Sequence, residues 1–278
     1  MDEGQTTAFR AFMATHPDQK ETAYPLIRGV GGNKWGTVFV EGQASDPMWT
    51  LTGSVPDAVS QLETIGFHAP ESLGEQLTGT SDSPFVVLDR ASGFSVWAAK
   101  AVMVSDHTIS VGAAGLFMHD SNGLDKRNPR SDSSVNFRSR GAIPDAMVIR
   151  HDLMSKAVAS GGDLGHVLHL FFVETDSAAG HVHPMIGHES GKEGWGAEGQ
   201  RIAVSPTADL SGCSPEGLVL ARTLQRHGAY LGDNSGGATA LKAQQDQGDA
   251  LWGSSLTPDE LGGCVDWEDF VVIATGWQ

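Results

Sequence analysis

The chain has 278 residues, 40% of them hydrophobic, and no run of apolar residues approaches the roughly 20 that a membrane-spanning helix needs. This length can bury one sizeable core, and the content of Trp, Phe, Val, Ile and Leu argues against intrinsic disorder. The 18 Lys and Arg residues face 34 Asp and Glu residues, so the net charge is −16 at pH 7. A chain this acidic repels phosphate backbones. We therefore expect neither nucleic acid nor membrane as a partner.

Short strands dominate the pattern. The 35 glycines are scattered without a period, which is typical of strands joined by tight turns. Apolar or β-branched runs bounded by Gly, Pro, Asp or Ser predict strands at Thr37–Glu41, Phe85–Arg90, Phe94–Val104, Ile109–Ala113, Val167–Val173, Arg201–Val204, Ala229–Gly232 and Val271–Ala274. Ser92 and Gly93 suit a hairpin turn between the second and third of these runs.

Helices are few. The clearest is predicted at Pro215–His227, where Ser214 is a good N-cap and Gly228 can end the helix in a left-handed conformation. Two shorter helices are predicted at Asp57–Ile65 and Asp152–Ala159. Many strands with a few short helices predict an all-β fold, a jelly-roll-like β-sandwich. We expect residues 1–278 to form a single domain with residues 1–20 as an N-terminal extension.

The chain contains two cysteines, Cys213 and Cys264, and neither belongs to a CxxC pair. A zinc site built on cysteine is therefore disfavoured, and we expect two small buried thiols. A single disulfide is the alternative if the protein is exported. The first residues lack the basic and apolar segments of a signal peptide, so we expect either a cytoplasmic protein or a chain without its leader.

His181 and His183 form an H-x-H pair ahead of Glu189. On a strand, residues i and i+2 point to one face, so both imidazoles could reach one ion, as in metal sites of the cupin type. Five residues separate His183 from Glu189, one more than the cupin pattern has, and the second half of that pattern is missing. We favour a polar loop of hydrogen-bonded histidines and keep a divalent metal at these three residues as the alternative.

Two further histidines, His166 and His169, lie on or beside the strand predicted at Val167–Val173. Strand alternation places one on each face. A buried imidazole needs a hydrogen-bonding partner, so each residue is interpreted first as a core histidine. Their position just before the His181 and His183 loop makes a functional role the alternative.

Acidic and aromatic side chains supply other candidates. Asp89 ends an apolar strand and Asp233 begins an Asp-Asn-Ser-Gly segment, and two carboxylates facing one groove are what glycoside hydrolysis needs. Asp233 could instead cap a turn. Trp97 and Trp195 could stack on sugar rings, although most tryptophans of a sandwich fill its core. Trp195 stands between two glycines, which favours exposure on a loop.

Motifs of several large enzyme classes are missing from the sequence. It has no phosphate-binding G-x-x-x-x-G-K-[ST] loop, no G-x-G-x-x-G turn, no G-x-S-x-G elbow, no HExxH and no EF-hand loop. Nucleotide-dependent enzymes and serine hydrolases of these types are therefore disfavoured.

Several segments recur together in an order that resembles a known family. They are Tyr24-Pro25, Asn33-Lys34-Trp35-Gly36, Asp46-Pro47-Met48-Trp49, Gly162–Leu168, His183-Pro184, Gly199-Gln200-Arg201-Ile202 and Ala221–Gly236. The order resembles a largely uncharacterised family of bacterial secreted proteins, often joined to carbohydrate-binding or carbohydrate-active modules. The resemblance covers roughly residues 24–273, and this chain departs from it at His227, where relatives usually carry Tyr.

The resemblance implies an all-β fold, a polysaccharide context and a secreted or cell-surface location. Residues of interest within the matching segments and the earlier hairpin are Asp89, Trp97, His166, His183, Arg201, Asp233 and Asn234. A likeness of fold is only an association as far as function is concerned.

We therefore expect a polysaccharide-cleaving enzyme, with hydrolysis by Asp89 and Asp233 slightly favoured. In the alternative, elimination from a uronic acid, His166 or His183 would be the base, Arg140 or Arg201 would neutralise the substrate carboxylate and Tyr230 would donate a proton. Substrate contacts are expected from Trp97, Arg140, Trp195, Arg201, Tyr230 and Asn234. The sequence is also compatible with a non-catalytic carbohydrate-binding module or a metal-dependent enzyme, and no organic cofactor is expected.

Overall fold

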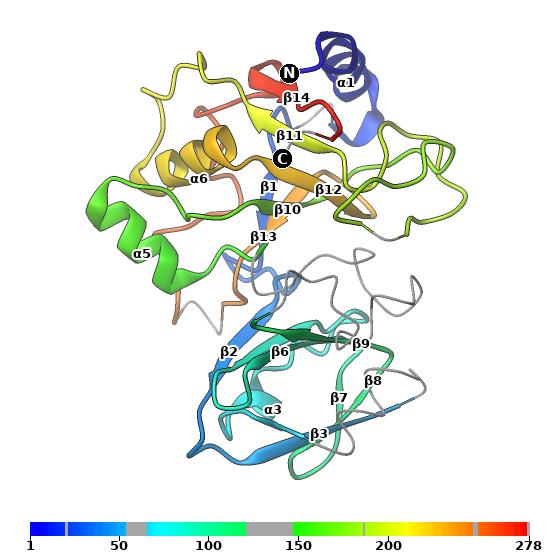
Figure 1. Ribbon diagram of the computed structural model, residues 1–278. Helices are drawn as coiled ribbons and strands as arrows, with labels where there is room; N and C mark the ends of the chain where they lie inside the picture. Colours follow the sequence, from blue (N-terminus) through cyan, green and yellow to red (C-terminus); the bar gives the residue numbers. More distant parts are fainter. Residues whose placement is uncertain (20–21, 54–65, 121–146, 186, 247–249, 277–278) are drawn as a thin grey trace.

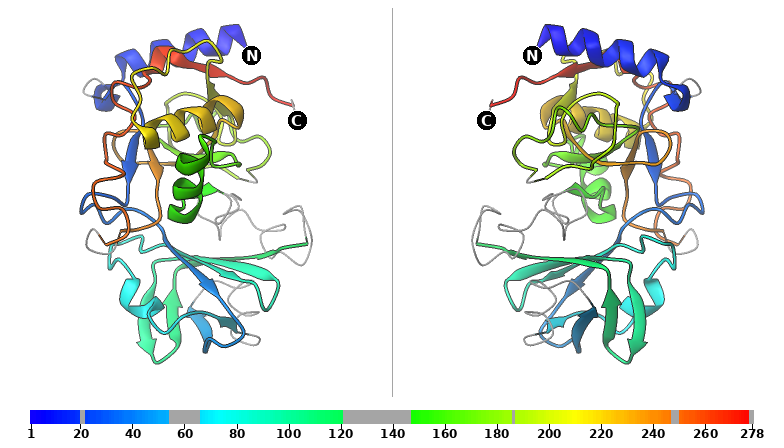
Figure 2. Two further views of the ribbon diagram at one scale, coloured as in Figure 1. Left: turned by 90° about the vertical axis from the view of Figure 1, so that its left-hand side faces the viewer. Right: turned by 90° about the vertical axis from the view of Figure 1, so that its right-hand side faces the viewer.

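The computed structural model describes residues 1–19, 22–53, 66–120, 147–185, 187–246 and 250–276. Within these ranges the chain is mostly β sheet with a few short helices, which confirms the prediction at this level. Figure 1 shows two lobes, a large one with α1, α5 and α6 and a small one below it. Both stack along one axis in the two side views of Figure 2.

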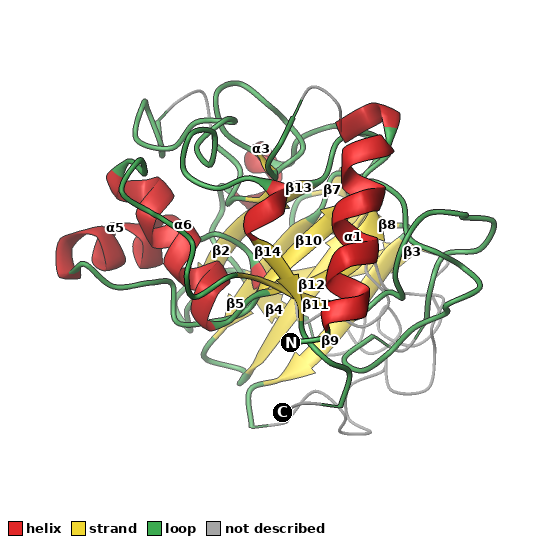
Figure 3. Cartoon of the chain, turned by 90° about the horizontal axis from the view of Figure 1, so that it is seen from above, coloured by secondary structure: helices red, strands yellow, loops and turns green. Residues whose placement is uncertain are grey.

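The large lobe is built on a six-stranded sheet of order β1-β13-β10-β12-β11-β14. Its strands are β1 Leu26–Arg28, β10 Leu168–Phe172, β11 Arg201–Val204, β12 Ala229–Asn234, β13 Ala240–Lys242 and β14 Phe270–Val272. Its helices are α1 Glu3–Thr15, α5 His151–Ser160 and α6 Pro215–Arg226, with short 3-10 turns at Pro17–Gln19 and Trp267–Asp269. Seen from above in Figure 3, α1 crosses the sheet while α5 and α6 lie together at one side.

The small lobe holds two four-stranded sheets, of orders β2-β5-β6-β9 and β4-β3-β8-β7. Its elements are β2 Val38–Gly42, β3 Met48–Gly53, β4 Phe67–His68, α3 Leu73–Gln76, β5 Phe85–Asp89, β6 Phe94–Ala99, β7 Val102–Ser105, β8 Thr108–Val111 and β9 Ala113–Met118. Side chains from both sheets form one core that includes Trp49, Phe67 and Phe85. The hairpin predicted around Ser92 and Gly93 is present as β5 and β6.

Four strand pairs are parallel, namely β1 with β13, β10 with β12, β2 with β5 and β3 with β8. Jelly rolls are antiparallel, so these pairs set the fold apart from the predicted jelly-roll form. Parallel pairs need long crossovers, which local sequence patterns do not reveal. Strands β1, β3, β4, β9 and β13 were not predicted, and of these β1, β3 and β13 take part in parallel pairs. The helix predicted at Asp57–Ile65 lies outside the described residues.

The N-terminal segment is part of the core of the large lobe. Phe9 and Met13 on α1 are 0% and 1% exposed, and the Phe9 ring lies 5.0 Å from that of Trp195 and 6.1 Å from that of Trp267. Asp2 caps α1 by accepting from the backbone N–H of Gln5 at 3.0 Å. Residues 1–20 therefore do not form the predicted extension, because one face of α1 is apolar and covers the sheet.

Helix α6 forms as its sequence predicts. The Ser214 hydroxyl accepts from the backbone N–H of Gly217 at 2.9 Å, and Gly228 follows the helix with φ of +67°. Just before the helix, Cys213 forms a disulfide with Cys264. The expectation of two free thiols is therefore wrong and the alternative holds, because the fold brings together two cysteines that lie 51 residues apart in the sequence.

Candidate functional site

The six-stranded sheet has one apolar and one polar face. Leu168, Leu170 and Phe172 of β10 point into the main core under α1 and α6. Because strand residues alternate between faces, His169 and Phe171 point the other way, toward the small lobe. The same core contains Ile27, Leu241, Leu231 and Ile202. The strand residues next to them in sequence therefore point to the polar face.

Five polar side chains form a row across this face, one from each of five adjacent strands. Arg28 is paired with Lys242, His169 with Tyr230, and Tyr230 with Arg201. Leu170 faces Leu241 in the antiparallel pair β10–β13, and continuing that register brings Lys242 beside His169. We call the set Arg28, Lys242, His169, Tyr230 and Arg201 the cross-strand row.

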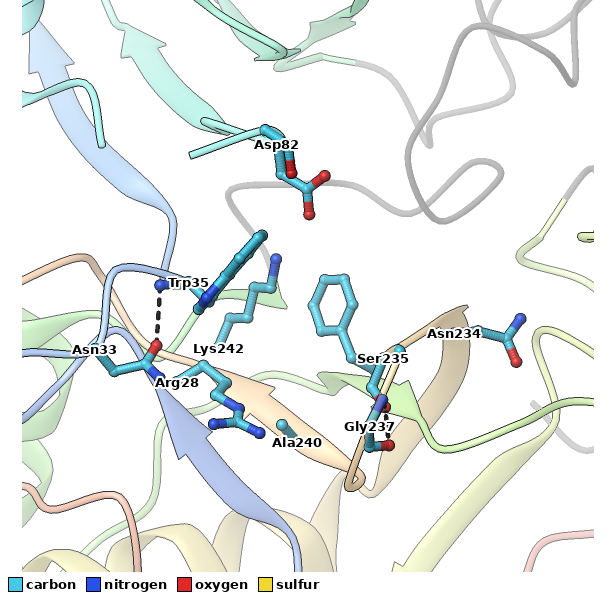
Figure 4. Close-up of a pocket in the computed structure, with 12 residues that line it drawn as sticks. Arg28, Asn33, Trp35, Asp82, Asn234, Ser235, Gly237, Ala240 and Lys242 are labelled. Atoms are coloured by element: carbon cyan, nitrogen blue, oxygen red, sulfur yellow. Dashed lines mark hydrogen bonds between the residues drawn. The ribbon is translucent and has the colours of Figure 1, made fainter. Parts of the chain in front are cut away.

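One end of the cross-strand row opens into a pocket between the lobes with a volume of about 530 Å³. The described residues that line it are Arg28, Asn33, Trp35, Ser81, Asp82, Phe171, Asn234, Ser235, Gly236, Gly237, Ala240 and Lys242. Figure 4 shows Lys242 extending from the sheet toward Trp35, with Asp82 of the small lobe facing it from the opposite wall. The described lining of the pocket therefore combines two cations, one carboxylate and two aromatic rings.

Trp35 presents its ring to this pocket, and the side chain is 43% exposed. The backbone around it is fixed, because the side-chain oxygen of Asn33 accepts from the N–H of Trp35 at 2.9 Å and from that of Gly29 at 3.3 Å. Gly36 next to it donates to Gln245 at 3.0 Å. An exposed tryptophan on a braced turn suits stacking against a flat ligand face.

Lys242 is a nearly buried cation, 7% exposed, with its ammonium nitrogen 4.0 Å from the centre of the Phe171 ring. Arg28 stands beside it on β1. Two adjacent cations create local positive potential on a chain whose net charge is −16. Together with the carboxylate of Asp82, the described lining of the pocket therefore holds two positive charges and one negative charge.

His169 lies deeper in the cross-strand row. It is 6% exposed, and its ring meets the Phe171 ring edge-on with the ring centres 4.3 Å apart. Its Nε2 packs so closely on Gly232 that a Cβ at that position would overlap it. Gly232 belongs to an irregular stretch of β12, because the pairs Leu170–Leu231 and Phe172–Asn234 leave an extra residue on β12. Bulges of this kind re-aim side chains and are frequent beside active sites.

Tyr230 and Arg201 occupy the other end of the row. The guanidinium carbon of Arg201 lies 5.9 Å from the centre of the Tyr230 ring, and Arg201 Nε donates to the carbonyl oxygen of His227 at 2.7 Å. Tyr230 is half-buried and packs beside Val167, Met147 and Met185. The structure thus brings together the two members of the predicted elimination set that lie on β11 and β12.

Asn234 is held by its neighbours. Its side-chain oxygen accepts from the N–H of Thr175 at 2.7 Å, and its amide nitrogen donates to the carboxylate of Glu189. Figure 4 shows the side chain directed away from Lys242 and Arg28. Asn234 therefore fixes the loop that carries Glu189, while Ser235 and the following glycines line the pocket. Asp233 lies beside it on the bulged part of β12, half-buried.

Asp89 does not face a groove. Its carboxylate is 0% exposed and lies in the small lobe, where it accepts from the backbone N–H groups of His68 at 2.8 Å and Ser92 at 2.9 Å. Burial alone would raise the pKa of Asp89, but the hydrogen bonds from His68 and Ser92 outweigh it and lower the pKa. Because Asp89 is fully buried in the small lobe and holds a hairpin there, it does not face a common groove with Asp233, and the predicted pair is not formed.

The two candidate tryptophans are core residues. Trp195 is 9% exposed and packs against Phe9, Phe172 and the rest of the main core. Its neighbouring glycines do not mark an exposed loop, because they allow close backbone approach: Gly194 lies against the backbone of Glu174. Trp97 is 6% exposed among Phe39, Val86 and Phe117 of the small lobe. Neither tryptophan is available for stacking on a sugar.

The remaining histidine candidates lie elsewhere. His166 is half-buried, and its Nδ1–H donates to the carbonyl oxygen of Val167 at 2.8 Å. His183 is exposed, and His181 pairs with His188 through Nδ1 atoms 3.2 Å apart. In the part of the chain that the structure describes, no three His, Cys, Asp or Glu side chains come together to hold a metal ion, and Glu189 binds Asn234 instead. Arg140 lies outside the described residues.

Comparisons of the chain with protein-family models, with curated protein sequences and with solved structures gave no match. Among the described residues, no helix is both long and apolar enough to cross a membrane. The site is therefore interpreted from its own chemistry.

Sequence reasoning missed most of the pocket. Arg28, Lys242 and Asp82 stand in three short segments far apart in the chain, and no spacing links them. Asn33 and Trp35 belong to one of the segments that carry the family resemblance, which was the available signal. His169 was considered only as one of two strand histidines, and its alternation with Leu168 and Leu170 was the clue to its face.

Proposed function

We propose that this protein binds a polysaccharide in the pocket between its lobes and cleaves it there. The observation that carries the proposal is the exposed ring of Trp35 beside Arg28, Lys242 and Ser235 in one pocket. Aromatic faces stack on sugar rings, and charged side chains with hydroxyl groups supply the directional contacts that a sugar needs. The cross-strand row next to the pocket adds titratable groups for the chemistry.

Export of the protein belongs to the same proposal. Disulfides persist in oxidising compartments, so the bond between Cys213 and Cys264 supports a secreted or cell-surface location. A polysaccharide of the cell surface or the surroundings would be accessible there.

The test is a panel of neutral and acidic polysaccharides, with binding and new reducing ends as readouts. We expect binding and cleavage of at least one polymer. Arg28→Gln should weaken binding about 10-fold or more, because a hydrogen bond from a charged group contributes roughly 1.5–3 kcal/mol. Arg90→Gln is the matched control, since Arg90 is 62% exposed in the small lobe and its loss changes the net charge equally.

Each outcome of the panel has a distinct meaning. Binding that Arg28→Gln weakens, without cleavage of any polymer, would make the protein a non-catalytic carbohydrate-binding module and overturn the enzymatic part. Absence of both binding and cleavage would overturn the proposal as a whole. Equal weakening by Arg28→Gln and Arg90→Gln would remove the pocket as the binding site.

A further inference from the structure

We propose that the edge strand β7 of the small lobe binds an extended segment of a partner protein in which basic and apolar side chains alternate. The bound segment adds a strand to the sheet of order β4-β3-β8-β7. This inference goes beyond the proposed function, because β7 and the residues around it do not line the pocket between the lobes.

Strand β7 differs from the other strands that the structure describes, because all four of its residues are exposed. Val102 and Val104 are 62% and 57% exposed, and Met103 between them is 38% exposed. Each of the other described strands has at least one buried residue. Burying these three apolar side chains against another chain is therefore favourable.

The outer edge of β7 also presents backbone hydrogen-bonding groups. On its inner side β7 pairs with β8, where Val102 lies opposite Ser110 and Met103 opposite Ile109. Among the described residues, no backbone hydrogen bond joins Val102, Met103 or Val104 to a segment on the outer side. Lys and Pro commonly protect such edges, and β7 contains neither. An edge of this kind is a template for a strand of another chain.

The two faces of β7 determine the pattern of the bound segment. Met103 lies opposite Ile109, which belongs to the core of the small lobe, so Met103 points to that side of the sheet. There it packs over Gly74 of α3 and lines a pocket of about 600 Å³. Val102 lies opposite Ser110 and points to the other side. A strand beside β7 therefore places alternate side chains at this pocket and beside Val102.

The pocket beside Met103 is acidic. Its described lining includes the exposed residues Glu71, Glu75 and Asp106 and contains neither Lys nor Arg. Glu71 Oε2 lies 2.7 Å from Nε2 of His107, which ties α3 and the residues before it to the turn that follows β7. The side chains of the bound segment that face this pocket are therefore basic.

Charge also distinguishes between two possible occupants of the edge. A second copy of this chain carries a net charge of −16 and is repelled, whereas a basic segment is attracted. In both side views of Figure 2 the hairpin of β7 and β8 lies at the end of the small lobe that is farther from the large lobe. A partner can therefore reach β7 without covering the pocket between the lobes.

The first experiment measures the binding of labelled synthetic peptides to the full chain by fluorescence anisotropy. Two peptides alternate Lys with Val or Arg with Leu, and two others have the same compositions with the basic residues grouped at one end. We expect an alternating peptide to bind about 5-fold or more tightly than its grouped counterpart, the value of one well-placed surface ion pair. Equal binding of both arrangements would reduce the effect to general attraction by an acidic chain and overturn the proposal. Absence of binding by all four peptides at about 1 mM, the limit of weak affinity, would overturn it as well.

Hydrogen exchange locates the bound peptide. Addition of the alternating peptide should slow the exchange of backbone amides within Val102–Ser105, because a strand paired with the outer edge shields them. The amides of β1 in the large lobe should be unaffected. Binding without slower exchange in β7 would overturn the assignment of the edge.

Variants test the edge and the acidic pocket separately. Val104→Lys should weaken binding of the alternating peptide about 10-fold or more, because a cation at the edge repels a basic strand. Val104→Thr is the control, since it keeps a β-branched side chain, and should bind within about 2-fold of wild type. Glu71→Gln should weaken binding about 2- to 5-fold. Glu268→Gln in the large lobe is its matched control, because the two side chains are 73% and 72% exposed.

The remaining outcomes decide between occupants and between proposals. Equal losses from Glu71→Gln and Glu268→Gln would show that only the overall charge matters and would remove the acidic pocket from the site. Dimerisation of the wild-type chain that Val104→Lys abolishes, measured by sedimentation, would assign the edge to a second copy and overturn the proposal. Arg28→Gln should leave peptide binding unchanged, so a failure of either proposal is distinguishable from a failure of the other.

Discussion

The two lobes differ in how the chain assembles them. All described elements of the small lobe come from one continuous stretch, Val38–Met118, whereas the large lobe pairs β1 near the N-terminus with β13 and packs α1 on β14 near the C-terminus. The cross-strand row belongs to the large lobe. The candidate site therefore depends on contacts between distant segments of the chain, while the small lobe supplies one wall of the pocket and the residue Asp82.

The largest loss of stability in the large lobe is expected when the Phe9 side chain, which packs α1 onto the core, is removed. Phe9→Ala should lower the free energy of unfolding by about 3–5 kcal/mol, because Phe9 is 0% exposed and touches three aromatic rings. Chemical denaturation measures the change. Gln5→Ala on the exposed face of the same helix should stay within about 0.5 kcal/mol. A loss below about 1 kcal/mol for Phe9→Ala would return residues 1–20 to the role of an extension.

Removal of the disulfide is a second test of the stability of the large lobe, since both cysteines belong to that lobe. The double substitution Cys213→Ser and Cys264→Ser should cost about 2–4 kcal/mol, because the bond closes a loop over 51 residues in the unfolded chain. Reductant should destabilise the wild-type protein by a similar amount and leave the double variant unaffected. Sensitivity of both proteins to reductant would refute the assignment of the effect to this bond.

Substitution of Asp89 is the corresponding test of stability in the small lobe. Asp89→Asn should cost about 1.5–3 kcal/mol at neutral pH, because the buried carboxylate accepts two backbone N–H groups. The pKa of Asp89 in the folded protein lies below the ordinary value of 3.8. Its contribution is therefore fully present above pH 4 and is lost as the pH falls through the lower, folded-state pKa.

Denaturation at several pH values tests this dependence. The difference in stability between wild type and Asp89→Asn should shrink as the pH falls below about 4, the ordinary pKa range of Asp. Asp106→Asn, an exposed aspartate of the same lobe, should give a small difference at every pH. A constant difference between wild type and Asp89→Asn across this range would contradict the proposed role of the charge.

Local patterns predicted the elements that local interactions stabilise. The β5–β6 hairpin and helix α6 with Ser214 as its cap depend on residues within a few positions of one another, and both were predicted. Strands β1 and β13 are three residues each and join across more than 200 positions, so their pairing left no periodic signal. For the same reason the sequence did not predict Arg28 and Lys242 as residues of the candidate site.

Some residues of the candidate site were likewise predicted from the sequence, and others were not. Arg201 and Tyr230 were named from their residue types and a family resemblance, and the structure pairs them across β11 and β12. Asp89 and Trp195 were misplaced because a strand end and a glycine-flanked tryptophan are compatible with either exposure or burial. Burial depends on which distant segment covers a residue: here His68 covers Asp89, and α1 covers Trp195.

Substitution of Trp35 should change stability least of all, so its effect on binding can be measured separately from any effect on folding. Trp35→Ala should alter the free energy of unfolding by less than about 1 kcal/mol, since the side chain is 43% exposed. It should weaken polysaccharide binding by about 0.5–1.5 kcal/mol, the range for an aromatic contact, or roughly 2- to 12-fold in Kd. Met48→Ala in the small lobe, where Met48 is 45% exposed, is the matched control and should leave binding unchanged. Unchanged binding by Trp35→Ala would show that the polymer bypasses the pocket, whereas equal losses in both variants would point to a general effect of exposed apolar surface.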